Sequence, residues 1–452
     1  MLLCDRFVVS SRIENLLGYM MRNMAVAAVA LVSCMLFVAG ELRAENWPGW
    51  RGPRGDGTSL EKETPVRWSD TENVAWKVAV PYVGHASPIV WEDRLFLVGT
   101  DLEHLDRMLM AFDRANGKLL WKQSVVQSPL EGKHHLNSYA SSTPATDGKL
   151  VYVSFLEKKE APDKNQMLVA AYDFQGNQRW KVRPGVFSSV HGYCSSPVIF
   201  NDTVIVNGDH DGESYIVALN KATGETVWKT PRENRTRSYC TPIIRDIDGR
   251  TQMLLSGSKC VSSYDPRSGA QHWTIDGPTE QFVASLLYTH DLVFVTAGFP
   301  ELHVLTIRPD GRGKIDDSSI VWHHKGKMAS YVPSPIAVGD YILVASDFGV
   351  ASCFDARDGT VHWSKNLSRH YSASLVTASG LVYFLDDNGV TQVVKPGKEF
   401  EAVAVNKLLV APEGDEPPDS CSASPAISQG QIFVRTAKSL YCIGKSAQVA
   451  GK

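Results

Sequence analysis

A tryptophan closes a recurring phrase in this chain, and the spacing of the copies constrains the fold more than any other feature. In a clear copy, Asp113 is followed by Gly117 and then by Trp121. The gaps between successive tryptophans of the series are 45, 59, 48, 45, 49 and 41 residues. A period in this range is typical of propellers, solenoids and other repeat folds. The series comprises Trp76, Trp121, Trp180, Trp228, Trp273, Trp322 and Trp363.

A second phrase alternates with the first. A small hydroxyl residue precedes proline, or leucine in two copies, and a short apolar run follows. Proline is tolerated at the first residue of a strand, where no ladder donor is lost. The phrase therefore marks the start of a strand, once in each of eight units between about His85 and Gly444. The hydroxyl residues are Ser87, Thr143, Ser196, Thr241, Ser285, Ser334, Ser374 and Ser424.

One unit shows what each repeat contains. After Ser87-Pro88, a short β-rich run ends at Trp91, and further runs rich in strand formers cover 94–98, 107–112 and 118–122. Glycine in the turn before the last run can supply a positive φ. No unit shows an apolar 3.6-residue period, so a helical repeat is excluded. Four antiparallel strands in about 45 residues make one propeller blade.

The ends of the repeat predict how the ring closes. The eighth unit contains three strands and no fourth, whereas a strand with Trp76 precedes the first unit. An N-terminal strand that completes the last blade would remove two open sheet edges. We therefore predict an all-β, eight-bladed β-propeller of four-stranded antiparallel blades, closed by an N-terminal strand. Residues 45–84 supply that strand, 85–445 form the propeller and 446–452 are a tail.

Residues 1–44 are interpreted as an N-terminal extension and signal peptide. Arg22 precedes an apolar run over 24–39, which is too short to span a bilayer, and Ala44 offers a cleavage point. We therefore expect an exported protein of the periplasm or cell envelope. The run Leu31-Val-Ser-Cys34 is similar to a lipoprotein box, so a lipid anchor at Cys34 is the alternative. Membrane association is expected only through the signal or such an anchor.

Charge and cysteine content bound the partners and the redox chemistry. The formal net charge is −3, with both signs mixed along the chain, so nucleic acid is not expected as a partner. Cys194, Cys240 and Cys421 each stand just before a strand start. A disulfide among them is one option in an exported protein, and the spacing does not assign a pairing.

The paired phrases resemble the PQQ-like (quinoprotein-type) β-propeller repeat family. The segment from Val217 to Trp228, Val-Ala-Leu-Asn-Lys-Ala-Thr-Gly-Glu-Thr-Val-Trp, carries the resemblance most clearly, and the opening segment over 46–57 is similar to one found on exported bacterial members. The family includes dehydrogenases that hold pyrroloquinoline quinone (PQQ) with Ca²⁺ on the axis. It also includes a non-catalytic lipoprotein of the outer-membrane assembly machine, BamB.

The two kinds of family member imply different functions for this chain. The dehydrogenases carry adjacent cysteines and often a haem domain, whereas this chain has neither Cys-Cys nor C-x-x-C-H. We therefore expect a BamB-like, non-catalytic binding or assembly scaffold in the cell envelope, with envelope proteins as partners and no cofactor. The alternatives are a PQQ- and Ca²⁺-dependent oxidoreductase that uses an axial funnel, and a propeller that binds a carbohydrate or peptide.

The residues just before each first strand are candidates for a ligand funnel. The first strand of a blade is innermost, so these positions should surround one mouth of the central channel. Aromatic walls with a few polar groups suit a small planar or sugar-like ligand. The alternative is that the tyrosines only pack the channel mouth. The candidates are His85, Asn137, Tyr139, His191, Tyr193, Arg237, Tyr239, Gln281, Tyr331, His370 and Tyr371.

Three further features are interpreted as structural. The series tryptophans should pack between neighbouring blades. His134 and His135 are adjacent, so on a strand they would point to opposite faces, and no metal site is predicted. The acidic stretches 209–213 and 386–389 fall where turns between second and third strands are expected, and their Asp, Asn and Gly residues favour turns. No catalytic residue is predicted.

Overall fold

A computed structural model describes residues 45–409 and 418–445. These belong to one compact unit, Glu45–Lys452. The predicted signal peptide over 1–44, its Cys34 and the tail 446–452 lie outside the described residues. Within the described part of the chain, no helix is long and apolar enough to cross a membrane.

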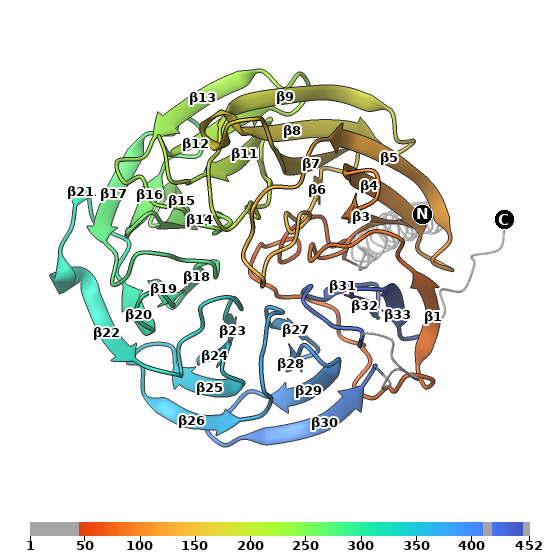
Figure 1. Cartoon of the computed structure of the whole chain (residues 1–452). Helices are drawn as coiled ribbons and strands as arrows, with labels where there is room; N and C mark the ends of the chain where they lie inside the picture. Colours follow the sequence, from red (N-terminus) through yellow and green to blue (C-terminus); the bar gives the residue numbers. More distant parts are fainter. Residues whose placement is uncertain (1–44, 410–417, 446–452) are drawn as a thin grey trace, which may run out of the picture. The chain divides into compact units, whose positions relative to one another are not determined.

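The described chain forms eight antiparallel four-stranded sheets arranged as blades around a ring (Figure 1). In each blade the first strand lies innermost and the fourth outermost. The predicted eight-bladed propeller is therefore confirmed. Blade 1 contains β2 (Ile89–Trp91), β3 (Arg94–Asp101), β4 (Asp106–Asp113) and β5 (Leu119–Gln127), and blade 2 contains β6 (Ala145–Thr146), β7 (Leu150–Glu157), β8 (Gln166–Asp173) and β9 (Gln178–Val186). Blade 3 contains β10 (Val198–Phe200), β11 (Thr203–Gly208), β12 (Tyr215–Asn220) and β13 (Thr226–Pro231), and blade 4 contains β14 (Ile243–Ile247), β15 (Arg250–Gly257), β16 (Cys260–Tyr264) and β17 (Gln271–Asp276).

The second half of the ring repeats this arrangement, and blade 4 gains a short parallel fifth strand, β21 (Gly313–Lys314), along β17. Two single-turn 3₁₀ helices, η1 (Pro162–Lys164) and η2 (Asp317–Ser319), lie between strands. Blade 5 contains β18 (Leu287–Thr289), β19 (Leu292–Ala297), β20 (His303–Ile307) and β22 (Ile320–Lys325), and blade 6 contains β23 (Ile336–Val338), β24 (Tyr341–Ala345), β25 (Val350–Asp355) and β26 (Val361–Asn366). Blade 7 contains β27 (Val376–Ala378), β28 (Leu381–Leu385), β29 (Val390–Lys395) and β30 (Glu401–Lys407), and blade 8 contains β31 (Ala426–Ser428), β32 (Gln431–Arg435), β33 (Ser439–Ile443) and β1 (Val74–Ala79).

Strand β1 closes the ring as predicted. It pairs antiparallel with β33, so that Trp76 lies opposite Cys442 and Ala79 opposite Ser439. Arg435, in β32, is 1 % exposed and donates to the carbonyl oxygens of Ala86 and Val98 in blade 1. The terminal N–H groups of this buried guanidinium thus bond carbonyl oxygens of the neighbouring blade and join blade 8 to blade 1.

The tryptophan phrase describes a contact between neighbouring blades. The indole N–H of Trp228, on the outer strand of blade 3, donates to the carbonyl oxygen of Pro266 in blade 4 at 3.1 Å. Gly269 closes the same turn with φ +72°, and a Cβ there would lie 2.5 Å from the Trp228 ring. Glycine is therefore needed both for the positive φ and for the space that the indole fills.

The same contact recurs around the ring. Trp322 is the exception: its N–H has no hydrogen-bond partner within the described residues, and its ring stacks on Phe354 with centroids 5.9 Å apart. The outer strand of blade 7 contains no tryptophan. The remaining indoles each donate to a carbonyl oxygen of the next blade: Trp76 to Arg114, Trp121 to Phe174, Trp180 to Lys221, Trp273 to Pro309 and Trp363 to Gly397.

The hydroxyl residues of the second phrase form the inner counterpart of this contact. In six of the eight steps around the ring, the backbone N–H of one hydroxyl residue donates to the hydroxyl oxygen of the next blade. Ser87 donates to Thr143, Thr143 to Ser196, Ser196 to Thr241, Ser285 to Ser334, Ser334 to Ser374 and Ser374 to Ser424, over 2.9–3.1 Å. We call this set the hydroxyl ring. It explains the serine or threonine at this position in six of the eight units, all but Ser87 and Ser285.

The segment over 46–59 does more than lead to the closing strand. It pairs through Trp47 with Val90 in blade 1 and through Thr58 with Thr377 in blade 7. Between these points it lies within the ring (Figure 1). Arg51, 3 % exposed, donates to the carbonyl oxygens of Pro335 and Ser334 in blade 6. We call residues 46–59 the plug segment.

The cysteines of the described residues, including Cys194, Cys240 and Cys421, are all free thiols. The disulfide left open by the sequence is therefore not formed in this structure.

Candidate functional site

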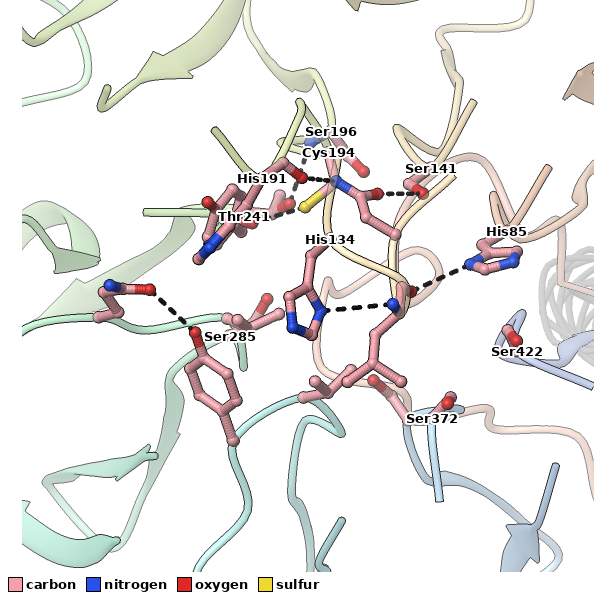
Figure 2. A pocket seen from close by; sticks show the side chains of 18 of the residues that line it. His85, His134, Ser141, His191, Cys194, Ser196, Thr241, Ser285, Ser372 and Ser422 are labelled. Carbon is pink, nitrogen blue, oxygen red and sulfur yellow. Dashed lines mark hydrogen bonds between the residues drawn. The ribbon is translucent and has the colours of Figure 1, made fainter. Parts of the chain in front are cut away.

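A cavity of about 420 Å³ lies where the residues before the first strands of the blades converge (Figure 2). Residues from widely separated parts of the sequence face one another across it, because each blade contributes its innermost loop. We call it the axial pocket. Seven of the eleven residues proposed for the funnel line it: His85, Asn137, His191, Arg237, Tyr239, Gln281 and Tyr331.

The other four candidates lie outside the lining. Tyr193 and Tyr371 are buried in hydrophobic clusters between blades, at 4 % and 1 % exposure. Tyr139 packs under the cations of Arg107 and Lys133. His370 is held by Asp387, with Nδ1 2.8 Å from a carboxylate oxygen. These residues support the loops that frame the pocket.

Trp50, in the plug segment, is a lining residue that the sequence did not single out. Its indole N–H donates to the Ser285 hydroxyl at 2.9 Å. Trp50 also lines a second cavity of about 320 Å³, formed by the plug segment with the inner strands of blades 2 to 4. The indole therefore borders both cavities, at the inner end of the axial pocket.

The opposite end of the pocket opens to solvent. Phe299 lines the pocket and is 50 % exposed, so it stands at the mouth. His134 and His191 lie close together on one wall, with ring centroids 5.2 Å apart, and His134 reaches toward the middle of the lining residues (Figure 2). The pocket thus has an aromatic residue at its inner end, Trp50, and another at its mouth, Phe299.

Five hydroxyl groups of the ring face this pocket and are 2–6 % exposed: Ser196, Thr241, Ser285, Ser374 and Ser424. Each hydroxyl oxygen accepts one N–H, four from the ring itself and one from Trp50. A hydroxyl can also donate one hydrogen bond. Among the described residues, none of these five donates to an acceptor. Their O–H groups are therefore available to a molecule in the pocket.

Arg237 is the one Lys or Arg side chain among the described lining residues, and an ion pair balances its charge. Arg237 Nη1 lies 2.6 Å from a carboxylate oxygen of Asp211. Burial lowers the pKa of His191, and the positive charge of Arg237 lowers it further. Burial also lowers the pKa of His134. Both imidazoles are therefore neutral at pH 7, and the pocket carries no net charge from these groups.

His85 is the most strongly shifted histidine of the pocket. Burial lowers its pKa from 6.5 to about 4, and the nearby Arg435 guanidinium acts in the same direction. Its Nδ1 lies 3.2 Å from the carbonyl oxygen of Leu136. The neutral ring therefore serves as a fixed donor to the backbone of the next loop.

Carboxylates stand behind the lining rather than in it. Asp347 accepts from the backbone N–H groups of Tyr331 and Val332, and burial raises its pKa. Asp387 accepts from the N–H of Ser372 and from His370. Both aspartates follow the second strand of a blade and hold the loop that enters the same blade, so they position the pocket wall.

This donor set does not fit a Ca²⁺–quinone centre. Ca²⁺ prefers several oxygen ligands, with carboxylates among them. Over residues 45–409 and 418–445, no aspartate or glutamate lines the axial pocket. Over the residues that the structure describes, no group of three or more His, Cys, Asp or Glu side chains is arranged to hold a metal ion. The residues present therefore offer neither the metal ligands nor a carboxylate base for quinone-dependent oxidation.

Comparison with known proteins places the chain in a family. The family model described as outer membrane protein assembly factor BamB matches residues 61–159, 106–286 and 314–399, which is more than half of the chain. The chain belongs to this family of PQQ-like repeat β-propellers. No curated protein sequence matches it significantly.

Solved structures share the fold at low identity. BamB from Moraxella catarrhalis is 13 % identical with a TM-score of 0.56, over 83 % of this chain and 98 % of that one. A europium-containing methanol dehydrogenase is 11 % identical with a TM-score of 0.51, over 88 % and 98 %. The quinohemoprotein alcohol dehydrogenase from Comamonas testosteroni is 12 % identical with a TM-score of 0.52, over 92 % and 83 %. Enzymes and a named assembly factor thus share this propeller, so the site must decide between them.

Proposed function

We propose that this protein is an exported, non-catalytic binding propeller of the cell envelope and that the axial pocket is its ligand site. The observation that carries the proposal is the pocket itself: it is flanked by aromatic rings and lined by unused hydroxyl donors, and no carboxylate of the described residues lines it. Among the described residues, no imidazole that lines the pocket is hydrogen-bonded to a hydroxyl or a thiol, and no metal ligand set is present. Convergent polar groups without such an activated pair support binding rather than turnover.

Two features support the cellular setting. The apolar run over 24–39 has the length of a signal peptide, and the family model is described by an outer-membrane assembly factor. Envelope proteins are therefore the proposed partners, met through the blade edges and loops outside the pocket.

The test has one arm for binding and one for catalysis. The full chain is purified from envelope extracts of its own cells and analysed by native mass spectrometry for a bound small molecule. Gln281→Ala is expected to weaken retention of that molecule. Gln252→Ala changes a buried glutamine of blade 4 outside the lining, and this control variant should retain the molecule.

Reconstitution with PQQ and Ca²⁺ should produce no saturable dye-linked oxidation of alcohols or sugars. Saturable oxidation that depends on added quinone would overturn the proposal.

A further inference from the structure

The five hydroxyl groups of the axial pocket define what its ligand must offer. Each oxygen already accepts an N–H, and no described residue accepts the remaining O–H. A buried donor without a partner costs about 1–3 kcal/mol. A matching ligand therefore presents several acceptor oxygens to the inner half of the pocket, close to Trp50.

The walls add acceptors as well as donors. No hydrogen bond within the described residues involves the ring nitrogens of His191 or Nε2 of His134, and neutral imidazole has one donor and one acceptor nitrogen. The Gln281 carbonyl oxygen accepts from the Tyr331 hydroxyl, which leaves its NH₂ group free. An anionic oxygen can only accept, so it would leave the imidazole acceptors unused. A hydroxyl group of a ligand can satisfy both kinds of partner.

Charge balance points to the same ligand class. Arg237 is paired with Asp211, and the pKa values of the wall histidines are lowered. An unbalanced charge transferred into such a pocket loses its hydration without gaining an opposite charge. The ligand that fits without this loss is neutral.

The remaining surface is apolar and aromatic. Trp50 forms the inner end, Tyr239 and Tyr331 line the walls and Phe299 stands at the mouth. A pyranose ring combines C–H faces, which pack on aromatic rings, with hydroxyl groups that donate and accept. A volume of about 420 Å³ lies within the range of small-molecule sites.

We propose that the axial pocket binds sugar residues of a neutral oligosaccharide, with the hydroxyl ring and wall histidines bonding the sugar oxygens and Trp50 packing on a pyranose face. This inference rests on the proposed function, because it names the ligand class of the same pocket. It adds a role for the hydroxyl ring: the ring holds the blades together through its oxygen atoms and binds sugar through its hydrogen atoms.

The test uses the full chain and isothermal titration with defined probes. The neutral probes are maltose, cellobiose and diacetylchitobiose, and the acidic probes are digalacturonic acid and glucose 6-phosphate. We expect saturable binding of at least one neutral probe and no binding of the acidic ones. Binding of acidic probes alone, or of none of the five, would overturn the sugar assignment. In that case the proposed function would still stand if native mass spectrometry found another bound molecule.

Two matched pairs of variants test the hydroxyl ring. Thr241→Val removes a ring hydroxyl that lines the pocket, and Thr143→Val removes one that does not. Each variant loses one ring hydrogen bond, so both should be similarly destabilised. We expect Thr241→Val to weaken neutral sugar binding about tenfold or more, and Thr143→Val to change it less than about twofold.

The second pair, Ser374→Ala with Ser334→Ala as its control, repeats the comparison in blades 7 and 6 if a threonine variant fails to fold. Equal losses of affinity within both pairs would show that the ring acts only through stability, and would overturn the proposal.

Discussion

The outer and inner edges of the blades carry two repeated contacts that differ in what they leave free. At the outer edge, the indole of Trp228 both donates to a carbonyl oxygen of the next blade and fills the space over Gly269. At the inner edge, the hydroxyl of Thr241 accepts an N–H of the preceding blade and has no described acceptor for its own hydrogen. The outer contact uses both the N–H and the ring of the indole between the blades, whereas the inner contact leaves the hydroxyl hydrogen free to bind a ligand.

This difference separates stability from function within one repeat. A side chain whose polar and apolar surface is fully used between blades can contribute only to the fold. A side chain with an unused donor beside a cavity can contribute to both. The following predictions test the separation, beginning with the largest expected effect.

The strongest test of the outer edge is Trp273→Ala. Trp273 is 0 % exposed and bonds to Pro309 of the next blade. Its loss should lower the free energy of unfolding by about 3–5 kcal/mol, because a large buried ring leaves a cavity. Urea denaturation followed by intrinsic fluorescence measures the change. Val405→Ala, at a residue 61 % exposed, is the control and should stay within about 0.5 kcal/mol. Similar small losses in both variants would contradict the account.

A smaller effect is expected when the tryptophan stays and its glycine changes. Gly269→Ala introduces a Cβ 2.5 Å from the Trp228 ring at φ +72°. Gly249→Ala, in the same blade, introduces one at φ +73° with nothing within 4 Å. The left-handed backbone should lower the free energy of unfolding of both variants by about 1–2 kcal/mol. The clash should lower that of Gly269→Ala by about 1–3 kcal/mol more. Thermal unfolding of the two variants would give equal shifts if the close packing were unimportant.

The inner edge should contribute a pH dependence through His85. The pKa of folded His85 is about 4, against 6.5 for an ordinary histidine. The unfolded chain therefore binds more protons between these values, so the stability contributed by neutral His85 is complete above about pH 6.5 and is lost as the pH falls toward 4. The loss should be roughly 1–3 kcal/mol. Denaturation of the native protein and of His85→Gln at several pH values measures this loss. The free energy of unfolding should depend less on pH in His85→Gln, and the same pH dependence in both proteins would contradict the burial argument.

The smallest effect compares two outer tryptophans. Trp363 donates to the carbonyl oxygen of Gly397 at 3.1 Å, whereas the N–H of Trp322 has no partner within the described residues. Trp363→Phe loses a hydrogen bond that Trp322→Phe does not. Trp363→Phe should therefore be about 1 kcal/mol more destabilising. Paired thermal denaturation checks this, and a larger loss in Trp322→Phe would show that the indole N–H is irrelevant to these contacts.

The repeat made the architecture predictable from the sequence, because each copy reports the same local contact. The two phrases set the number of blades, and the missing fourth strand located the closing strand at Trp76. The positions before the first strands also predicted much of the pocket lining. Tyr193 and Tyr371 were placed in the funnel on the same rule, yet their rings turn into the clusters between blades. Which side a loop residue faces depends on packing that the repeat alone does not encode.

Two parts of the site had no readable signal of their own. Trp50 lies in the plug segment, which has no counterpart in the repeat, so nothing in the periodicity placed it on the axis. The hydroxyl ring was recognised only as a marker of strand starts. Its hydrogen bonds connect residues 40–56 positions apart and exist only once neighbouring blades pack together. The presence of a hydroxyl in all eight copies was the available clue.

The central claim is that the inner hydroxyls bind a ligand in addition to joining the blades, and the most direct measurement is the affinity of a neutral disaccharide for Thr241→Val and Thr143→Val side by side. Both variants lose the same kind of ring bond. The account predicts similar stability for the two and an affinity about tenfold or more weaker for Thr241→Val alone. Equal affinities in the two variants would contradict it.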